Sequence, residues 1–198
     1  MKLHYKPGQT IMEMLVVFFI ITVGLYAAVT LIFSNVVLRE QDEDHIIAMN
    51  LARESLELAQ NIRDSNWLAN LDYDVGLGTD TGMDCTAVPD WYGTAYPAFD
   101  FSVNDLAGGR INRSSNLASL GMYTNQNGTS TRFSRLITFA PICADPADRL
   151  DRQASPNCTC TDPAYSEKIG TRVGVDVQWE RKGKTQILTI YTDLYDWR

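Results

Sequence analysis

Residues 8–33 read GQTIMEMLVVFFIITVGLYAAVTLIF, and this segment decides the fold. From Ile11 to Phe33 there are 23 residues, and Glu13 is the only charged one. As a helix, this stretch would be about 34 Å long, enough to cross a hydrocarbon core of about 30 Å. A carboxylate within hydrocarbon costs about 2.5–3.5 kcal/mol at the helix centre and less near an end. The sequence therefore predicts a membrane span. The presence of one energetically costly acid, Glu13, within that span requires an explanation.

The span contains no cation that could pair with Glu13. There is no Lys or Arg between Lys6 and Arg39. A new α-amino group would be such a cation if the chain were cut just before the span. The alternative is that Glu13, in the first turn, reaches the membrane interface, where the helix N-terminus also favours a negative charge.

Gly8 and residues 9–17, QTIMEMLVV, resemble the cleavage and methylation signal of type IV prepilins and pseudopilins. In that family a prepilin peptidase cuts after the glycine on the cytoplasmic side and N-methylates the new terminus. The family's glutamate is the fifth mature residue, and Glu13 is fifth when Gln9 is first. The resemblance implies cleavage between Gly8 and Gln9, possible N-methylation of Gln9, and a filament in which Glu13 pairs with the Gln9 amine of a neighbouring subunit.

Two positions differ from the family's pattern. Gln9 stands where the family usually has Phe or Met, so the resemblance implies cleavage more directly than methylation. Major pilins commonly carry a helix-kinking proline within the span, whereas the span here has none and only Gly24 to soften the helix. The run from Ala48 to Trp67 is more similar to minor pilins and minor pseudopilins than to major subunits.

The charges that flank the span predict its orientation. Lys2 and Lys6 precede it, whereas Glu40, Asp42, Glu43 and Asp44 follow it. The positive-inside rule predicts a single-pass protein of the inner membrane, with its N-terminus in the cytoplasm and the bulk of the chain outside. After assembly the resemblance implies a filament or the cell surface.

An ordinary signal peptide competes with this interpretation. Its apolar core is about 7–15 residues long, and the core here is longer, with only Ala27–Ala28 as a poor cleavage site. A plain signal anchor fits the length but explains neither Gly8 nor Glu13. The alternative function is accordingly a signal-anchored extracellular binding domain that does not polymerise.

Composition fits one membrane helix and one modest globular domain. The chain has 198 residues, of which 45% are hydrophobic, and a net charge of −7. Without Lys2 and Lys6 the charge is about −9, which argues against nucleic-acid binding through a basic patch. We expect a leader at 1–8, a transmembrane and assembly helix at 9–33, its amphipathic continuation at 34–66 and an extracytoplasmic head at 67–198.

The continuation of the helix has the pattern of an amphipathic segment. There is no Pro or Gly between Ser34 and Asp64, and we expect the helix to run from Ile11 to about Asp64, ending in Asp64–Asn66. Ile47, Leu51, Leu58 and Ile62 form the predicted apolar face. A stripe of small residues beside it consists of Ala48, Ala52, Ser55 and Ala59. The polar side consists of Arg53, Glu57, Gln60 and Asp64.

The head divides into a glycine-rich half and a strand-rich half. Residues 67–130 predict turns and a long loop with a small strand or helical turn, and residues 131–198 predict the sheet. Strands are expected at 132–142, 172–180 and 185–195, the last two joined by a hairpin loop at 181–184. The predicted fold class is α+β, with the long helix packed on an antiparallel sheet of three to four strands.

Four cysteines lie beyond the span: Cys85, Cys143, Cys158 and Cys160. A direct Cys158–Cys160 bridge would be strained, so each of these two is expected to pair with Cys85 or Cys143, in either order. Free thiols and a zinc site are the two alternatives, although Cys-x-Cys is shorter than the usual ligand spacing for zinc. The acids Asp72, Asp74, Asp80 and Asp84 are interpreted as solvated loop residues, with calcium binding as the alternative.

No residue pattern indicates an enzyme, so no catalytic residue, metal or cofactor is predicted. His4 leaves with the leader, and His45 lies in an acidic helix without a nucleophile beside it in the sequence. The four tryptophans, Trp67, Trp91, Trp179 and Trp197, are interpreted as core aromatics rather than a carbohydrate platform. The expected partners are a prepilin peptidase, other pilin or pseudopilin subunits and the membrane, and not nucleic acid.

Overall fold

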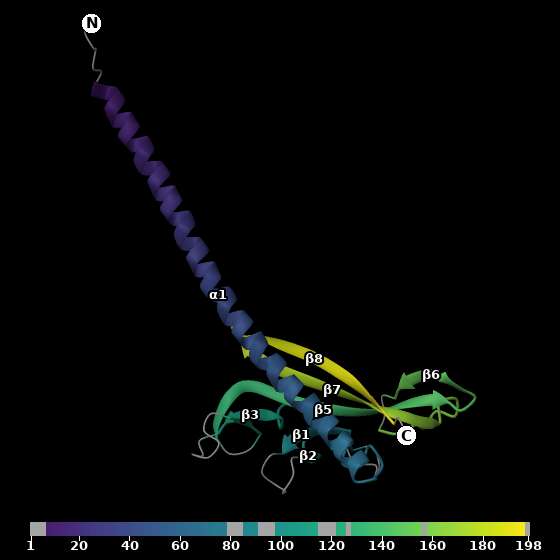
Figure 1. Ribbon diagram of the computed structural model, residues 1–198. Coiled ribbons are helices and arrows are strands. Elements are labelled where there is room, and N and C mark those ends of the chain that lie inside the picture. The colour runs from purple at the N-terminus through teal and green to yellow at the C-terminus, as the bar shows by residue number, and fades with distance from the viewer. Residues whose placement is uncertain are drawn as a thin grey trace. The chain divides into compact units, whose positions relative to one another are not determined.

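The computed structural model describes residues 7–78, 85–90, 98–114, 122–125, 128–155 and 158–196, with side chains from residue 11 onward. The chain forms two compact units, Met1–Ile46 and Ile47–Arg198. We call the second unit the head. One long helix and an antiparallel sheet make the fold α+β, as predicted (Figure 1).

Helix α1, Pro7–Leu68, contains 62 residues. Proline suits the first helical position because an N–H there would have no partner within the helix. The helix begins four residues before the predicted start at Ile11 and ends four residues after the predicted end at Asp64. The prediction of one continuous helix through the apolar and amphipathic segments is confirmed.

A Schellman motif ends α1, and the predicted end at Asp64–Asn66 is wrong. Asn70 has a left-handed φ of 59°, its N–H donates to the Trp67 carbonyl at 3.1 Å, and the Leu71 N–H donates to the Asn66 carbonyl at 2.9 Å. The Asn66 amide instead donates to two carbonyls of the following loop. Asn66 thus holds the loop after the helix, which is why its polar character misled the prediction.

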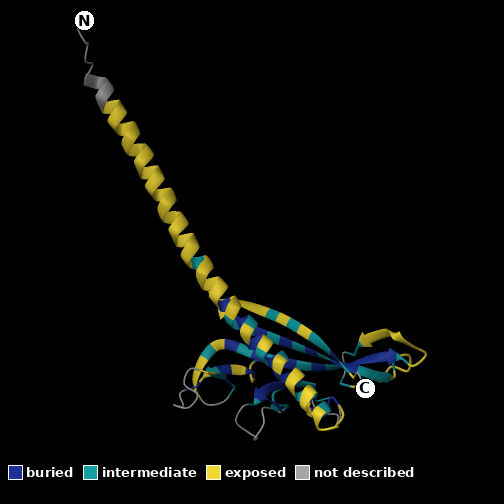
Figure 2. Ribbon diagram, viewed as in Figure 1, coloured by how far each residue is buried: buried dark blue, intermediate teal, exposed yellow. Residues whose placement is uncertain are grey.

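The head's part of α1 is amphipathic as predicted. All four small residues of the stripe, Ala48, Ala52, Ser55 and Ala59, have no exposed surface. Leu51 and Leu58 are also buried, whereas the predicted polar residues are exposed. Small side chains permit close approach of the helix to the sheet, so this face forms part of the head's core (Figure 2).

Within the described residues the sheet has eight strands, so the predicted number of three to four is wrong. They are β1 (Thr86–Asp90), β2 (Ala98–Asp100), β3 (Arg110–Arg113), β4 (Tyr123–Thr124), β5 (Thr129–Asp145), β6 (Asp148–Ala154), β7 (Glu167–Arg181) and β8 (Lys184–Tyr195). Strand β5 is central: β7 pairs along one side, and β3, β1 and β6 pair with successive parts of the other. Strand β8 continues the sheet beyond β7, β2 beyond β1, and β4 beyond β3.

The three long strands β5, β7 and β8 are those expected at 132–142, 172–180 and 185–195. Strands β5 and β7 extend beyond their predicted ranges, and β8 begins one residue before its predicted start. Val173, Val175, Val177 and Trp179 are buried on one face of β7. The hairpin between β7 and β8 turns on Lys182 and Gly183 alone, both at positive φ, which is the pattern of a type I′ turn.

Four strands that the sequence did not specify lie between residues 86 and 124. They contain two to five residues each, too few for a period to show. Just before β3 the chain comes so close to β5 that a Cβ on Gly109 would lie 2.1 Å from the Arg135 carbonyl oxygen. Phe99 of β2 packs edge-on against Phe139 of β5, with ring centroids 5.0 Å apart. Tertiary contacts therefore define these strands.

Candidate functional site

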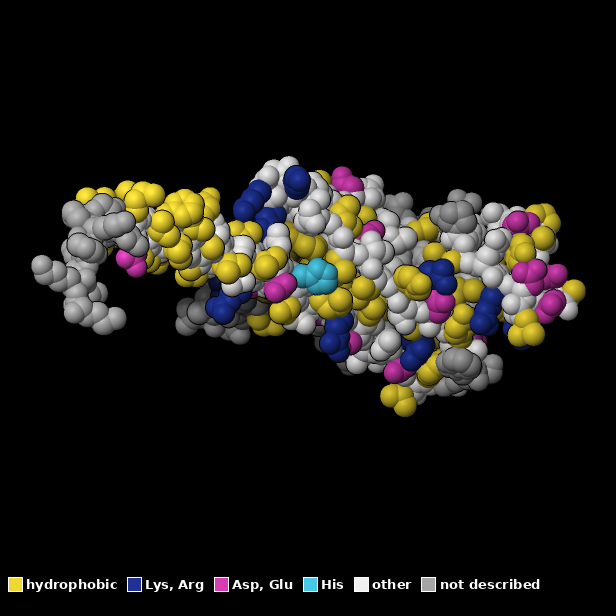
Figure 3. Space-filling model, turned by 90° about the horizontal axis from the view of Figure 1, so that it is seen from above, with side chains coloured by type: hydrophobic (Ala, Val, Ile, Leu, Met, Phe, Trp, Pro, Cys, Tyr) yellow, Lys and Arg dark blue, Asp and Glu magenta, His cyan; other side chains and the backbone are white. Residues whose placement is uncertain are grey.

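The apolar segment of the first unit is exposed throughout. Residues 11–36 of α1 are all exposed, and the large hydrophobic side chains between Ile11 and Phe33 are 47–73% exposed. Figure 3 shows these hydrophobic side chains covering the N-terminal part of α1. A soluble monomer rarely exposes an apolar patch above a few hundred Å². The helix is long and apolar enough to cross a membrane.

The aliphatic hydroxyl groups at positions 22, 30 and 34 already have partners within α1. The Thr22, Thr30 and Ser34 hydroxyls donate to carbonyls three residues earlier, at 2.9, 2.8 and 2.9 Å. A hydroxyl without such a bond would be costly in an apolar medium. These residues are therefore compatible with a lipid or helix-packed environment.

Glu13 remains the exception within the segment. Its side chain is exposed and forms no ion pair with any residue whose side chain the structure describes. Gly8 and Gln9 lie at the start of α1, in the part of the helix for which the structure describes only the backbone. Cleavage, methylation and the pairing of Glu13 with a Gln9 amine thus stay predictions.

Gly24 and Ala28 form a small-residue pair that the sequence analysis did not use. They are four residues apart and so lie on one face of α1. A Cβ added to Gly24 would have no heavy atom within 4 Å, so nothing inside the chain requires a glycine there. Such pairs let helices approach closely in membranes. The four-residue spacing was the signal that could have identified it.

Two disulfides secure the loop between β6 and β7. Cys85 bonds to Cys158 and Cys143 to Cys160, with Cα–Cα distances of 5.4 and 5.7 Å. This is one of the two pairings that the sequence left open. All four thiols are used, so none is available for the alternative zinc site. The disulfides indicate that the head resides in an oxidising, extracytoplasmic compartment.

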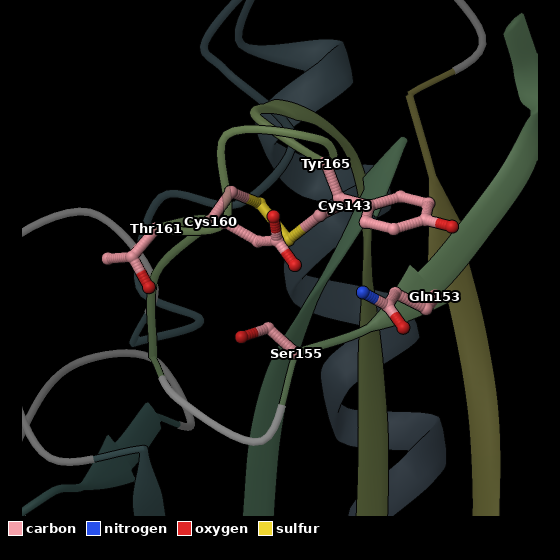
Figure 4. Close-up of a pocket in the computed structure, with 7 residues that line it drawn as sticks. Cys143, Gln153, Ser155, Cys160, Thr161 and Tyr165 are labelled. Carbon is pink, nitrogen blue, oxygen red and sulfur yellow. A yellow bond between two sulfur atoms is a disulfide. The ribbon is translucent and has the colours of Figure 1, made fainter. Parts of the chain in front are cut away.

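A small pocket lies beside the Cys143–Cys160 bridge (Figure 4). Its volume is about 190 Å³, and its lining includes Gln153, Ser155, Thr161 and Tyr165. The Ser155 hydroxyl donates to the Thr159 carbonyl at 3.0 Å, and the Tyr165 hydroxyl donates to Asp151 at 3.1 Å, which raises the Tyr165 pKa. Ligand pockets usually hold about 300–1,000 Å³. These contacts serve to order the disulfide-bonded loop.

The predicted acidic cluster is only partly described. Asp80 and Asp84 lie outside the described residues, and Asp74 forms an ion pair with Lys168 at the start of β7. The neighbouring Tyr73 hydroxyl lies 3.3 Å from the Thr171 hydroxyl oxygen. No group of three or more His, Cys, Asp or Glu side chains fit for a metal occurs among the described residues. Asp74 therefore attaches the loop to β7, and it is buried rather than solvated as predicted.

Two of the four tryptophans, Trp67 and Trp179, lie within the described residues. Trp179 is buried and packs against Phe133, with ring centroids 6.2 Å apart, so its prediction as a core aromatic is confirmed. Trp67 lies under the Arg63 guanidinium at 4.6 Å. Trp91 and Trp197 are outside the described residues.

Arg135 is a buried charged residue that sequence reasoning missed. It lies on the core-facing side of β5 and has no exposed surface. Its guanidinium donates to the Leu51 carbonyl and to the Glu54 carboxylate, both at 2.8 Å, and to the Asn125 side chain at 3.4 Å. Burial lowers the Arg135 pKa, and the Glu54 charge opposes that shift. Arg135 thus ties α1 to the sheet within the head.

The alternation of β5 contained the signal for Arg135. It occupies an inward position between Phe133 and Ile137, where an apolar residue is expected. A charge at such a position requires a specific partner inside the fold. The sequence could have identified the residue but not Glu54 as its partner, which lies 81 positions away.

Comparison of the chain with protein-family models, with curated proteins and with solved structures finds no match in any of the three.

Proposed function

We propose that this chain is a structural subunit of a type IV pilus-like or type II secretion filament, of the minor pilin or pseudopilin kind. It is inserted with its N-terminus in the cytoplasm and its head outside the inner membrane. A prepilin peptidase cleaves it between Gly8 and Gln9, and the mature chain polymerises through its N-terminal helix. The resemblance of residues 8–17 to the prepilin signal supports the processing step.

One observation carries the proposal: an exposed apolar helix that contains a single acid. From Ile11 to Phe33, Glu13 is the only charged residue; apart from Tyr26, the other side chains are apolar or, at Thr22 and Thr30, bonded within the helix. In a bilayer the apolar side chains contact lipid, but placing the Glu13 carboxylate within hydrocarbon costs free energy. In a filament of packed helices the same surface contacts neighbouring subunits, and a neighbour's α-amino group neutralises Glu13. Assembly thus removes the cost that insertion imposes.

The head supports this proposal because its core does not depend on the apolar segment. The head's hydrophobic core uses α1 only from Ile47 onward, within the described residues. Two disulfides and the Arg135 contacts strengthen the same unit. Such a head keeps its structure when the N-terminal segment passes from lipid into a filament, as a polymerising subunit requires.

A signal-anchored extracellular binding domain that never polymerises is the second candidate. A helix that can cross a membrane, followed by a disulfide-bonded head, is equally suited to an anchor. An anchor, however, uses neither the Gly8–Gln9 junction nor Glu13. The two functions therefore differ in what a change at Glu13 does.

Glu13→Gln tests the proposal in cells that carry a prepilin peptidase and a filament assembly machine. We expect the variant to be inserted and cleaved but absent from the sheared filament fraction on immunoblots. Glu43→Gln is the matched control, because Glu43 is an exposed acid outside the apolar segment and should leave assembly unchanged. If the wild-type chain is also absent from filaments and Glu13→Gln behaves identically, the anchored-domain function replaces the proposal.

A further inference from the structure

The sheet's edges differ in how well they are protected against pairing with another strand. Three edge strands are short or charged: β2 has three residues, β4 has two, and four of the seven residues of β6 are charged. Short strands and charged side chains are the usual means of protecting an edge. Strand β8 is different, because it has 12 residues and pairs only with β7 among the described strands.

Strand β8 has none of the usual protection over most of its length. Residues 185–192, TQILTIYT, contain no charge, proline or glycine. Its register with β7 is unbroken over 12 successive pairs, so no bulge bends the edge away. Ile187 and Tyr191 are 58% and 66% exposed. This edge has the properties of a template for strand addition.

The hairpin turn determines which backbone groups face outward. The two-residue turn at Lys182–Gly183 makes Arg181 and Lys184 the first hydrogen-bonded pair of the hairpin. Pairs in an antiparallel ladder alternate between bonded and non-bonded. The odd-numbered residues of β8, such as Ile187, Thr189 and Tyr191, therefore direct their N–H and C=O groups away from β7.

The charges at the ends of the edge indicate what the occupant carries. Lys182 and Lys184 make the hairpin end basic, whereas Asp193 at the other end is already paired with Arg172 at 2.7 Å. An occupant with an acid beside the lysines complements the edge. Its central residues should be uncharged and β-branched or aromatic, because these pair well with Ile187 and Tyr191.

We propose that the outer edge of β8 binds an extended segment of another protein by strand addition, a segment uncharged over about eight residues with an acid next to Lys182 and Lys184. Main-chain hydrogen bonds to the odd-numbered residues of β8 hold it. Side-chain pairs with Ile187 and Tyr191 give it specificity.

A synthetic peptide of residues 182–196, KGKTQILTIYTDLYD, is a suitable probe. When antiparallel to β8 with Thr189 opposite Thr189, it places Ile187 opposite Tyr191 and its Asp196 opposite Lys182. We expect saturable binding to the full chain in detergent by fluorescence anisotropy, and none by a scrambled peptide. N-methylation of the peptide at Thr189, a bonding position, should weaken binding by about tenfold or more, whereas N-methylation at Ile190 should not.

Variants of the protein test the same edge from the other side. Ile187→Pro removes an outward N–H and leaves the β7–β8 bonds in place, so we expect about tenfold weaker peptide binding or more. Ile187→Ala keeps that N–H and should weaken binding less. Equal sensitivity to N-methylation at Thr189 and Ile190, or no binding at all, would overturn strand addition. A wild-type dimer in detergent that Ile187→Pro dissociates would show that a second copy is the occupant instead.

Discussion

The two parts of α1 share one backbone conformation but differ in what surrounds their side chains. Residues 11–36 are exposed on every side, whereas residues 47–62 bury Ala, Ser and Leu on one face and expose charges on the other. Helix formation is therefore not what distinguishes them. The distribution of apolar residues around the helix determines whether it packs on its own sheet or needs an environment from outside the chain.

The largest effect expected in this comparison is the loss of a disulfide, because cross-links occur only in the head. Removing Cys85–Cys158 should lower the free energy of unfolding by about 4 kcal/mol, and removing Cys143–Cys160 by about 3 kcal/mol, since the first closes the longer loop. The sequence separations are 73 and 17 residues. Paired Cys→Ser variants of the full chain, unfolded by denaturant in detergent and followed by tryptophan fluorescence, measure this difference.

Circular dichroism in the same experiment tests whether the two parts of α1 are independent. Helical signal should remain after the head unfolds, because the apolar segment stays helical in the micelle. Complete loss of the helical signal together with the head would show that the apolar segment depends on the head, contrary to the comparison.

The second effect concerns the charge that joins the head's part of α1 to the sheet. Arg135→Met should destabilise the head by about 2–3 kcal/mol, because it removes the bonds to Leu51 and leaves Glu54 without its cation. Arg172→Met is the matched control, since its pairing with Asp193 is more exposed and should contribute less than about 1 kcal/mol. Equal losses in denaturant unfolding would mean that Arg135 has no special role in docking the helix.

The smallest effect on the stability of the head is expected from a larger side chain introduced into each part of α1. Ala52→Leu should lower the free energy of unfolding of the head by about 1–3 kcal/mol, because Ala52 is fully buried and the packed core has no room for a larger side chain. Ala27→Leu, in the exposed apolar part, should change it by less than about 0.5 kcal/mol. Thermal unfolding of both variants in detergent compares them, and a similar loss at both positions would remove the distinction between the two parts.

Regular periodicity made much of the fold predictable. The long helix, its buried face and the strands β7 and β8 follow from spacings that persist over many residues, and β5 follows from its content of β-forming residues. The four short strands did not follow, because each exists only through pairing with β5 or with another short strand. The helix end was misplaced because Asn66 could serve either as a cap or, as it does, as an anchor for the next loop.

The sequence predicted the kinds of residue that form the candidate site but not the specific contacts that they make. The apolar segment and the pairing of Cys158 and Cys160 with the other two cysteines follow from composition and spacing. Arg135 could not be assigned a role, because its partners come from distant parts of the chain. The processing site at Gly8 and Gln9 and the role of Glu13 involve other molecules, so they remain predictions.

The N-terminus of the mature protein tests the central claim most directly. We would express the full chain in cells that carry a prepilin peptidase, purify it from membranes, and determine its intact mass and N-terminal sequence. The proposed function predicts a start at Gln9, with or without one added methyl group. A start at Met1, or just after Ala28, would contradict it and leave the head as an anchored or secreted domain.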